Sequence, residues 1–563
     1  MRNAVIRLIL AACLPITLSA TPNVVFILTD DQSDAFWKDY DSEHQPKLRK
    51  YLSEQGATVQ NSFSTTPVCC PSRSSIYTGK YIHNLGVYNN SGGSGGCASL
   101  DWQDGPERDN VAYHLRSLGV KSSFAGKYLN NYGLGSNNNS AFAMPGCLNV
   151  TRNREQSGMD ITCSSTIEHV PRGWDNWHGL AGNSIYYNYT ISNNGVAETH
   201  GDSYEDDYLI DVVKNRSLAF MEDMVGEGSP FFITASVPAA HEPADPAPQH
   251  ANYAEGIKAP RTPNYNVVLD DERHWMAGEG LNIDGKGMNA SVASFVDLLY
   301  RRRLAVLQSV DDMIEEFVTK LDDLGILDNT YIIYTSDNGY HLGQFGIPID
   351  KRQPYESDLR VPMFVRGPGI EKNVTIENSY ALNIDIAPTI LSFAGATEEQ
   401  IESYGFDGKP LNELLKKGET SRSQEFLVEY NGESWDGCTA FLENDFDGLF
   451  LDKVADGVQC GLRGPWSYVT EPLWNGTDTW SSIQDNSNNT YACVRSVGGE
   501  DGEDFQLCEW ISGEVEAFDL VEDEFQMKNL AIGMDDNELS VWTDKIKKLR
   551  TCAGTSCWDV SDI

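Results

Sequence analysis

The chain has 563 residues, of which 40% are hydrophobic and 22% charged, and its formal net charge at neutral pH is −40. This length corresponds to roughly three to four units of about 150 residues each, or to one large α/β core with an appended domain. The hydrophobic fraction excludes disorder as the state of the whole chain. The strong acidity argues against a nucleic-acid-binding protein and against one that docks on anionic membranes.

The first twenty residues are typical of a secretory signal peptide. Arg2 and Arg7 precede an apolar run from Leu8 to Leu18, and Ala20 ends a small-residue cleavage site. An uncleaved anchor is the alternative, although the run is shorter than the roughly 20 residues that cross a bilayer. No later stretch of the sequence is apolar for long enough to span a membrane. We therefore expect a protein that is secreted, held in a cell wall or delivered to a lysosome.

Sequons for N-glycosylation also fit an exported protein. In such a protein the Asn-x-Ser/Thr sequence marks surface loops, and we expect roughly half of the sequons to carry glycans. They lie at Asn89, Asn138, Asn149, Asn188, Asn215, Asn289, Asn373, Asn475 and Asn488.

Short apolar runs bounded by polar turns recur along the chain, and helical patterns lie between them. Each run has the length and composition of a buried parallel strand. The predicted strands are Asn23–Leu28, Val120–Ala125, Pro230–Ser236, Thr330–Tyr334 and Val361–Val365, and the predicted helices are Val111–Leu118, Tyr208–Met221, Phe295–Leu324 and Asn383–Ala394. This alternation predicts an α/β fold in which right-handed crossovers place helices over a mostly parallel sheet.

The character of the sequence changes near residue 424. Short strand-like runs follow at Glu425–Tyr430, Trp466–Thr470 and Ala517–Leu520, with cysteines and acidic residues between them and a last helix near Glu538–Leu549. We therefore predict three parts: a signal peptide (1–20), a catalytic α/β domain (21–424), and a smaller, disulfide-rich α+β domain (425–563) with an antiparallel sheet and a helix.

Polar side chains follow four of the predicted strands, at the edge where an open α/β sheet carries its reactive groups. They are Asp30 and Asp31, Lys127, His241, and Asp337 with Asn338. Adjacent carboxylate and amide oxygens are hard ligands that favour Ca²⁺ or Mg²⁺. The alternative is that each aspartate only caps the helix or turn that follows it. The occurrence of the pattern at two strand ends favours a metal site.

The densest chemical signal is the run from Thr66 to Gly79. Pro71 suits the first position of a helix, and Gly79 suits its exit. Cys69 would lie at the positive end of that helix, which lowers the pKa of a thiol and attracts anions. Arg73, one turn further on, can contact a tetrahedral oxyanion through two nitrogens. These residues indicate a nucleophile beside an anion clamp; the alternative is a disulfide cysteine next to a surface helix.

The same run resembles the signature of the type I sulfatases, Cys-x-Pro-Ser-Arg followed by Thr-Gly, in which the first cysteine is oxidised to Cα-formylglycine. Other segments resemble that family's first metal loop, Gly-Lys motif, substrate-histidine loop, second metal loop, second catalytic lysine and C-terminal strand with its turn. These segments are Asn23–Gln32, Gly126-Lys127, Ala240–Pro243, Ser336–Gly339, Ile349–Glu356 and Phe518–Leu520 with Asn529–Ala531. The resemblance covers residues 22–400 well and the tail weakly.

Within the family, three segments are most similar to the N-acetylglucosamine-6-sulfatase and arylsulfatase branch: Cys69-Cys70, Tyr81–Asn84 and Gly339–Phe345. The resemblance implies an alkaline-phosphatase-like fold, with a large, mixed, mostly parallel sheet between helices and a smaller C-terminal antiparallel sheet plus helix. It also implies that Cys69, modified by the formylglycine-generating enzyme, becomes an aldehyde hydrate. One hydroxyl of the hydrate would attack sulfur, and the other would then expel sulfate.

The family's other roles are carried over to matching positions. One Ca²⁺ would be held by Asp30, Asp31, Asp337, Asn338 and the modified Cys69. Asp337 would also help to deprotonate the attacking hydroxyl, and Arg73 would steady the hydrate. The sulfate oxygens would be bound, or the leaving oxygen protonated, by Lys127, His241 and Lys351.

One position departs from the family pattern. Many sulfatases carry a histidine two residues after the lysine of the Gly-Lys motif, as the base of the second step, whereas this chain has Leu129. Another group must then remove that proton. His83 and His341 are the candidates, and for each of them packing or distal substrate binding is the alternative.

The cysteine count agrees with this resemblance. Of the 12 cysteines, Cys13 leaves with the signal peptide, and conversion of Cys69 leaves an even number in a compartment where disulfides form. Six of the remaining cysteines crowd the last quarter of the chain, where we expect them to form disulfides. For Cys70, which lies beside the site, a disulfide and a free thiol both stay open, so five disulfides is an upper limit.

The sequence therefore predicts a secreted, arylsulfatase-type sulfuric ester hydrolase that acts on an aryl sulfate or a sulfated glycan, without a nucleic-acid partner or a membrane span. The alternative within the family is an N-acetylglucosamine-6-sulfatase. A phosphate or phosphonate monoesterase is less favoured, because such enzymes often need a second metal set. A glycan-binding pseudoenzyme is less favoured, because the constellation of reactive residues is intact.

Overall fold

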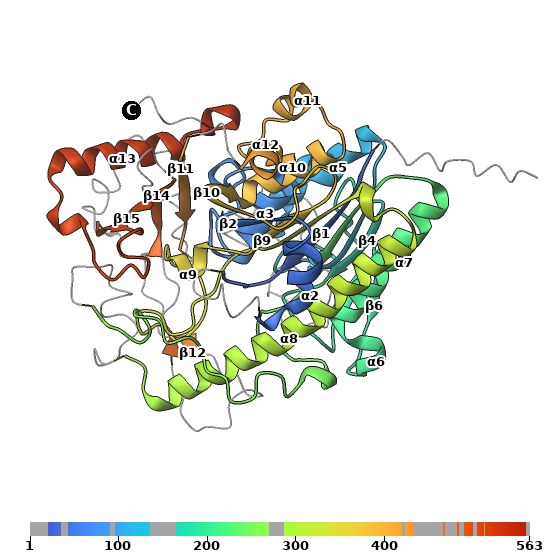
Figure 1. The fold of residues 1–563 in the computed structure, drawn as a ribbon, viewed down its shortest axis with the longest axis horizontal. Helices are drawn as coiled ribbons and strands as arrows, with labels where there is room; N and C mark the ends of the chain where they lie inside the picture. The colour runs from blue at the N-terminus through green and yellow to red at the C-terminus, as the bar shows by residue number, and fades with distance from the viewer. Residues whose placement is uncertain are drawn as a thin grey trace, which may run out of the picture.

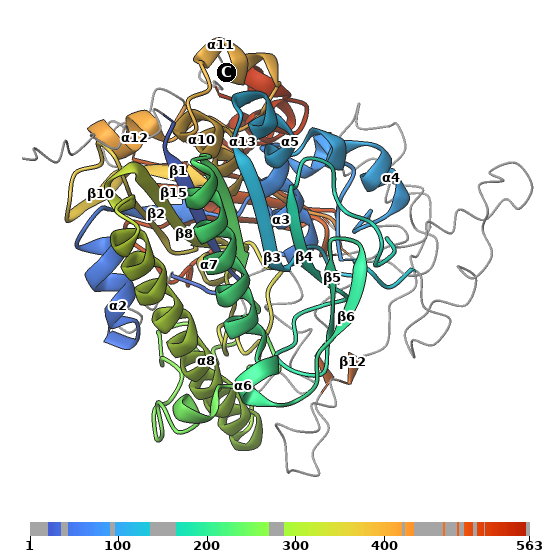
Figure 2. The same ribbon diagram turned by 90° about the vertical axis from the view of Figure 1, so that its right-hand side faces the viewer.

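A ten-stranded mixed sheet forms the centre of the protein (Figures 1 and 2). The strand order is β10-β2-β9-β8-β1-β7-β3-β4-β5-β6. The computed structural model describes residues 21–34, 43–90, 96–135, 165–269, 287–418, 423–432, 466–467, 481–482, 489–498, 504–511 and 513–558. The strands are β1 (Asn23–Thr29), β2 (Ala57–Phe63), β3 (Lys121–Lys127), β4 (Asn176–Leu180), β5 (Thr190–Asn193), β6 (Val196–Thr199), β7 (Phe231–Ser236), β8 (Thr330–Ser336), β9 (Met363–Arg366) and β10 (Val374–Leu382).

The middle of the sheet is parallel, as predicted. The strands β8, β1, β7, β3 and β4 pair side by side in one direction. Four of them, β1, β3, β7 and β8, are the predicted strands, each found within two residues of its predicted ends. Their carboxyl ends therefore meet at one edge, where the predicted reactive residues follow.

The fifth predicted strand, Val361–Val365, is present as β9 but runs antiparallel to both β2 and β8. The prediction of a parallel strand there is wrong. After β8 the chain does not first return along a helix: Asn338 and Lys351, both in the segment between β8 and β9, contact Asp31 at the carboxyl end of β1. The next strand must therefore enter the sheet from that end.

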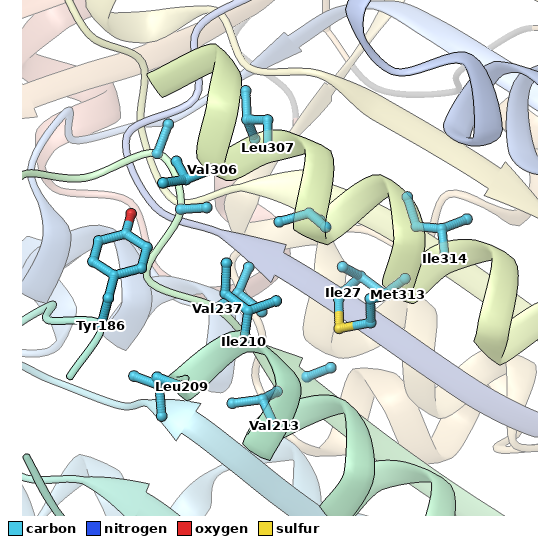
Figure 3. Close-up of a cluster of buried hydrophobic side chains, with 14 of the residues drawn as sticks. Ile27, Tyr186, Leu209, Ile210, Val213, Val237, Val306, Leu307, Met313 and Ile314 are labelled. Atoms are coloured by element: carbon cyan, nitrogen blue, oxygen red, sulfur yellow. The ribbon is translucent and has the colours of Figure 1, made fainter. Parts of the chain in front are cut away.

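Helices cover both faces of the sheet, and successive residues of β1 show this directly. Val25 and Ile27 share a buried cluster with residues of α7 (Leu209–Glu227) and α8 (Ala290–Asp323). Figure 3 shows Ile27 among side chains of these two helices. Phe26 instead shares a cluster with residues of helices on the other face, α3 (Cys69–Thr78), α5 (Val111–Leu115) and α10 (Ile386–Phe393). The predicted layers are confirmed.

The other helices are shorter, apart from the last one. They are α2 (Pro46–Leu48), α4 (Leu100–Asp104), α6 (Tyr204–Asp207), α9 (Glu356–Leu359), α11 (Glu398–Ser403), α12 (Asn412–Lys417) and α13 (Asp536–Arg550). Among the residues that the structure describes, no helix has both the length and the apolar character needed to cross a bilayer.

A second, antiparallel sheet follows in the chain, as predicted. Its strands are β11 (Glu425–Tyr430), β14 (Tyr491–Val497), β15 (Asp504–Trp510) and β16 (Val515–Asp519), paired in that order, while β12 (Trp466–Ser467) and β13 (Ser481–Ser482) pair separately. Residues of α13 pack against this sheet, and the disulfides Cys493–Cys508 and Cys552–Cys557 lie within this region. Two further cysteines of the region, Cys438 and Cys460, lie outside the described residues.

The two sheets pack against each other through one apolar cluster. The ring of Phe426 in β11 lies with its centroid 5.2 Å from that of Phe63 and 4.7 Å from that of Tyr380. Beside this contact, His83 Nδ1 lies 2.7 Å from a carboxylate oxygen of Glu429, and its Nε2 lies 3.0 Å from the carbonyl oxygen of Cys552. His83 therefore links the exit of α3 to the second sheet.

This link makes the stability of the fold depend on pH. Burial of the His83 ring disfavours its charge, but the Glu429 carboxylate outweighs this effect and raises the pKa of His83 to about 8, from an ordinary value of 6.5. Because the folded-state pKa is raised, the stabilisation is complete below pH 6.5 and is lost as the pH rises through about 8. This difference in pKa corresponds to about 2 kcal/mol.

We expect His83→Gln to lower the free energy of unfolding by about 2 kcal/mol more at pH 5.5 than at pH 9. Denaturant unfolding of both proteins at the two pH values measures this difference. An equal loss at both would mean that the ring acts only by packing.

Candidate active site

The four aspartate and asparagine residues predicted to bind metal lie together at the ends of β1 and β8. These strands are in register, with Thr29 opposite Ser336, so the residues that follow them are neighbours. The amide N–H of Asp31 donates to Asp337 Oδ1 at 3.1 Å, and Asn338 Nδ2 donates to Asp31 Oδ1 at 2.8 Å. Asp30 completes the group, and all four side chains are fully buried.

Each buried carboxylate has a cation within hydrogen-bond distance. Arg73 Nε donates to Asp337 Oδ2 at 2.6 Å. Lys127 Nζ donates to Asp30 Oδ2 at 2.6 Å, and Lys351 Nζ donates to Asp31 Oδ2 at 2.6 Å. The three cations come from α3, from the end of β3 and from the loop before α9, so distant parts of the sequence converge on one cluster.

The electrostatic setting differs between the aspartates. Burial disfavours the charge of Asp30, but Lys127 and Arg73 hold the pKa of that carboxyl well below its usual range. Burial raises the pKa of Asp337 to about 7, although Arg73 favours its charged form. Within the protein alone, Asp337 is therefore the carboxyl of the two that is more readily protonated.

Cys69 is the first residue of α3, with Val68 as the N-cap. The helix thus begins two residues before the position expected from Pro71, and it ends at Gly79, whose φ of 66° suits glycine. Cys69 is buried and, among the described residues, is the free cysteine. Its Sγ lies 3.8 Å from Asp30 Oδ1.

The predicted lowering of the thiol pKa by the helix end is wrong for Cys69. Burial raises the pKa of this thiol to about 12, and the nearby Lys127 and Lys351 offset only part of that effect. As an unmodified thiol in this setting, Cys69 would be protonated at neutral pH and therefore a poor nucleophile.

The cluster has the donors that a hard cation requires. One ligand atom from each of Asp30, Cys69 and Asp337 lies within 4.8 Å of the others. Asn338 Oδ1 is buried without a hydrogen-bond partner among the described residues, which would be costly unless another group used this oxygen. Carboxylate and amide oxygens of this kind suit Ca²⁺ or Mg²⁺.

His241 lies at the rim of the cluster. Its Nδ1 lies 2.7 Å from the carbonyl oxygen of Glu242 and therefore donates its proton there, which leaves Nε2 as the basic nitrogen. That Nε2 lies 3.8 Å from Asp31 Oδ2. The side chain is 13% exposed, so it is more accessible than the buried aspartates.

Position 129 supplies no base, because Leu129 is fully buried in the apolar cluster beside α3. Of the two candidate replacements, His83 is engaged at the junction of the sheets. It lies beyond the far end of α3, a ten-residue helix about 15 Å long. His341 lies in the loop that follows Asp337 and Asn338, and its Nδ1 lies 3.0 Å from Asp358 Oδ1.

Three further residues hold the site and were missed from the sequence. Ser184 Oγ donates to Asp30 Oδ2, and Ser236 Oγ accepts from Arg73 at 2.9 Å. Arg303, inside α8, donates to the carbonyl oxygens of Asp31 and Ala240. Of these three residues, only Ser236 could have been found from the sequence, because it ends a predicted strand.

Of the two possibilities that the sequence left open for Cys70, the structure shows the disulfide. Cys70 forms a disulfide with Cys97, which ties the start of α3 to the loop before α4. The amide N–H of Cys70 also donates to Asn90 Oδ1 at 2.9 Å. Both contacts fix the entry of the helix that carries Cys69 and Arg73.

A cation that binds this cluster only in the folded state will stabilise the fold, by about 2.7 kcal/mol at a concentration 100 times its dissociation constant. We expect Ca²⁺ added after chelation to raise the thermal midpoint by several degrees. Asn338→Ala should reduce this shift, because it removes the unpartnered oxygen. Differential scanning calorimetry measures both.

Asp297→Asn is the control for this measurement, since Asp297 pairs with Arg261 at 2.8 Å and accepts from the amide of Ala259, neither of which belongs to the cluster, and it should leave the shift intact. A full shift in Asn338→Ala would remove Asn338 from the ligand set.

Comparison with known proteins extends this picture. A family model described as Sulfatase matches residues 22–396. The N-acetylglucosamine-6-sulfatase of Homo sapiens is 37% identical over 566 residues, which cover 98% of this chain and 90% of the relative. The arylsulfatase of Chlamydomonas reinhardtii is 28% identical over 568 residues, covering 95% of this chain and 75% of that protein.

Solved structures share the fold. One of them, a protein in complex with its substrate D-glucosamine-2-N,6-O-disulfate, superposes with a TM-score of 0.64 at 19% identity. The superposition covers 94% of this chain and 97% of that chain, so both sheets of the present structure lie within the shared architecture.

Proposed function

The chain belongs to the sulfatase family and is a sulfuric ester hydrolase, and we propose that the cluster around Cys69 performs the hydrolysis. The observation that carries this proposal is the position of Cys69, a buried free cysteine at a helix start, between carboxylates and the cations Arg73, Lys127 and Lys351. A tetrahedral sulfate ester needs cationic donors of this kind. The expected products are inorganic sulfate and an alcohol or phenol.

We propose that Cys69 is converted to Cα-formylglycine by a formylglycine-generating enzyme. The hydrated aldehyde supplies two hydroxyls, one for attack on sulfur and one for release of sulfate. Because Cys69 is completely buried in the folded protein, the modifying enzyme must act before folding encloses it. The protonated state of the buried thiol argues that the unmodified cysteine is not the nucleophile.

We propose Asp30, Asp31, Asp337, Asn338 and the modified residue 69 as ligands of one Ca²⁺. The ion would supply Lewis-acid polarisation of a sulfate oxygen. The charges support this assignment: three carboxylates are balanced by Arg73, Lys127 and Lys351, so a divalent cation leaves the site with a net positive charge that attracts an anionic ester.

The remaining roles follow from position. Arg73, fixed by Asp337 and Ser236, would orient the nucleophile. Lys127 and Lys351 would donate to sulfate oxygens, and Asp31 raises the pKa of Lys351 well above its usual value in spite of burial, so this ammonium stays charged. His241, with its basic Nε2 at the rim, is suited to proton exchange with the leaving oxygen.

For the natural substrate we propose a sulfated glycan with a 6-sulfate on N-acetylglucosamine. The support is the similarity to the human enzyme of that name, which is 37% identical, against 28% for the algal arylsulfatase. Aryl sulfates would still be hydrolysed, because a phenolate is a good leaving group. This choice favours the alternative predicted from the sequence over the general arylsulfatase.

Three substrates test the function. We expect kcat/KM for N-acetylglucosamine 6-sulfate to exceed that for p-nitrophenyl sulfate, and p-nitrophenyl phosphate to react far more slowly than either. Ion chromatography of the released sulfate or phosphate measures all three. Preference for the phosphate ester would favour a phosphomonoesterase, and binding of the sugar sulfate without turnover would indicate a glycan-binding pseudoenzyme.

Cys69→Ser tests the nucleophile. A serine hydroxyl can attack sulfur once, but its sulfate ester lacks the second hydroxyl that releases sulfate. We expect a folded protein that turns over at most once and gains one sulfate at position 69, visible by peptide mass spectrometry. The same method should find formylglycine in the wild type. Repeated turnover by the variant, or an unmodified thiol in fully active wild type, would contradict the mechanism.

We propose that the protein is secreted or lysosomal and glycosylated. Of the described sequons, Asn188, Asn215, Asn289 and Asn373 are exposed and open to a glycan. Asn89 is only 5% exposed, and its neighbour Asn90 accepts a hydrogen bond from the amide N–H of Cys70. A glycan on Asn89 would therefore disturb the folded site.

A further inference from the structure

The loop that carries Lys351 has an unusual backbone. Asp350 and Arg352, on either side of Lys351, have φ angles of 110° and 93°. Residues other than glycine rarely adopt such left-handed conformations, and they keep them only where the surrounding structure holds them. The loop therefore needs contacts that hold it in this form. In this form Lys351 Nζ donates to Asp31 Oδ2.

A buried histidine–aspartate pair supplies two of these contacts. The amide N–H of His341 donates to the carbonyl oxygen of Asp350 at 2.8 Å. On the other side of Lys351, the amide N–H of Gln353 donates to Asp358 Oδ2 at 2.9 Å. The imidazole joins the two sides, because its Nδ1 lies 3.0 Å from each carboxylate oxygen of Asp358.

The pair is itself rigidly placed. His341 is 2% exposed, and Asp358 is fully buried in α9. Asp358 also accepts from Ser357 Oγ at 2.8 Å, so its oxygens are committed to nearby donors. The amide N–H groups of Gly339 and Tyr340 donate to α9 as well, each at 2.8 Å. The segment after the second pair of predicted metal ligands is thus tied to α9.

We propose that His341 and Asp358 form a positioning dyad that holds the backbone around Lys351 and so places its ammonium at the reacting ester. The proposal rests on the function proposed above, in which Lys351 contacts the sulfate or the leaving oxygen. The dyad acts through the loop, and the essential atom of His341 is Nδ1. The other nitrogen, Nε2, is buried without a hydrogen-bond partner among the described residues.

Two substitutions separate the nitrogens. In asparagine the amide nitrogen branches from Cγ as Nδ1 does in histidine, so His341→Asn keeps a donor toward Asp358 and removes Nε2. His341→Ala removes both. We expect His341→Ala to lower kcat for an alkyl sulfate such as N-acetylglucosamine 6-sulfate by about 100-fold. For His341→Asn we expect a loss of about threefold or less, because the bond to Asp358 survives.

A comparison of two leaving groups tests whether the His341–Asp358 dyad acts through Lys351. An alkoxide needs protonation or charge stabilisation far more than p-nitrophenolate does, so His341→Ala should lower kcat for p-nitrophenyl sulfate by only about tenfold. A partly unfolded sample would lose both activities by the same factor. In a Lys351→Ala background, His341→Ala should have almost no further effect, because the dyad would have nothing left to position.

His114→Ala is the control, because His114 is also a buried histidine paired with an aspartate, 2.9 Å from Asp109, but lies in α5. It should leave the ratio of the two activities as in the wild type. Should His341→Ala fail to fold, His341→Gln, which lacks a donor at the Nδ1 position, gives the same comparison. Formylglycine content normalises every variant.

Three results would overturn the proposal: equal losses on both substrates, a loss in His341→Asn as large as in His341→Ala, or additive effects of the Lys351 and His341 substitutions. An equal loss in His341→Asn and His341→Ala would mean that Nε2 of His341 acts directly as a catalytic group. Failure of the proposed function itself would look different, since the wild type would then release no sulfate.

Discussion

Three carboxylates, those of Asp30, Asp31 and Asp337, are buried side by side, and they could not remain charged there without cations in direct contact. An ion moved from water into the interior loses several kcal/mol of solvation even after relaxation. The structure meets this requirement with Arg73 and two lysines, each 2.6 Å from an aspartate oxygen. The positions of α3, of β3 and of the loop before α9 all depend on it.

Such a cluster is a poor way to stabilise a fold. Replacement of buried ion pairs by apolar residues of similar size is often neutral or stabilising, whereas removal of one partner costs about 3–5 kcal/mol. The arrangement is therefore better explained by chemistry than by stability. The same burial that raises the pKa of Asp337 to about 7 and of the Cys69 thiol to about 12 also excludes water, which strengthens every contact to an anionic ester.

The strand-end residues of the site could be predicted from one geometric rule, whereas Cys69 and Arg73 were identified from their motif and Lys351 only from the family resemblance. Parallel strands bring their carboxyl ends to one edge, so the residues after β1, β3, β7 and β8 meet there whatever the intervening sequence. The rule says nothing of contacts from elsewhere. Ser184 lies in an irregular segment after β4, and Arg303 lies among three consecutive arginines of a long amphipathic helix, where nothing distinguishes the buried member.

The errors in the fold have similar causes. The strands β2 and β10 were missed because polar residues interrupt their apolar positions, as in Asn61 of β2. The direction of β9 was wrong because a short apolar run does not reveal the side from which the chain enters. The pairing of Cys70 with Cys97 joins residues 27 positions apart, and cysteine spacing alone does not specify connectivity.

The second sheet, although distant in the sequence, helps to hold the loop that carries Lys351. Tyr491 of β14 donates from its hydroxyl to the carbonyl oxygen of Arg352 at 3.0 Å, and Gln506 of β15 donates to that of Pro354. Arg495 of β14 lies 3.2 Å from Glu356 at the start of α9. The loop that carries Lys351 is therefore held by the first sheet's own segments on one side and by the second sheet on the other. A chain that ended at residue 424 would keep all the proposed metal ligands but would lose these contacts, so the C-terminal region is better regarded as part of the catalytic framework than as an appendage.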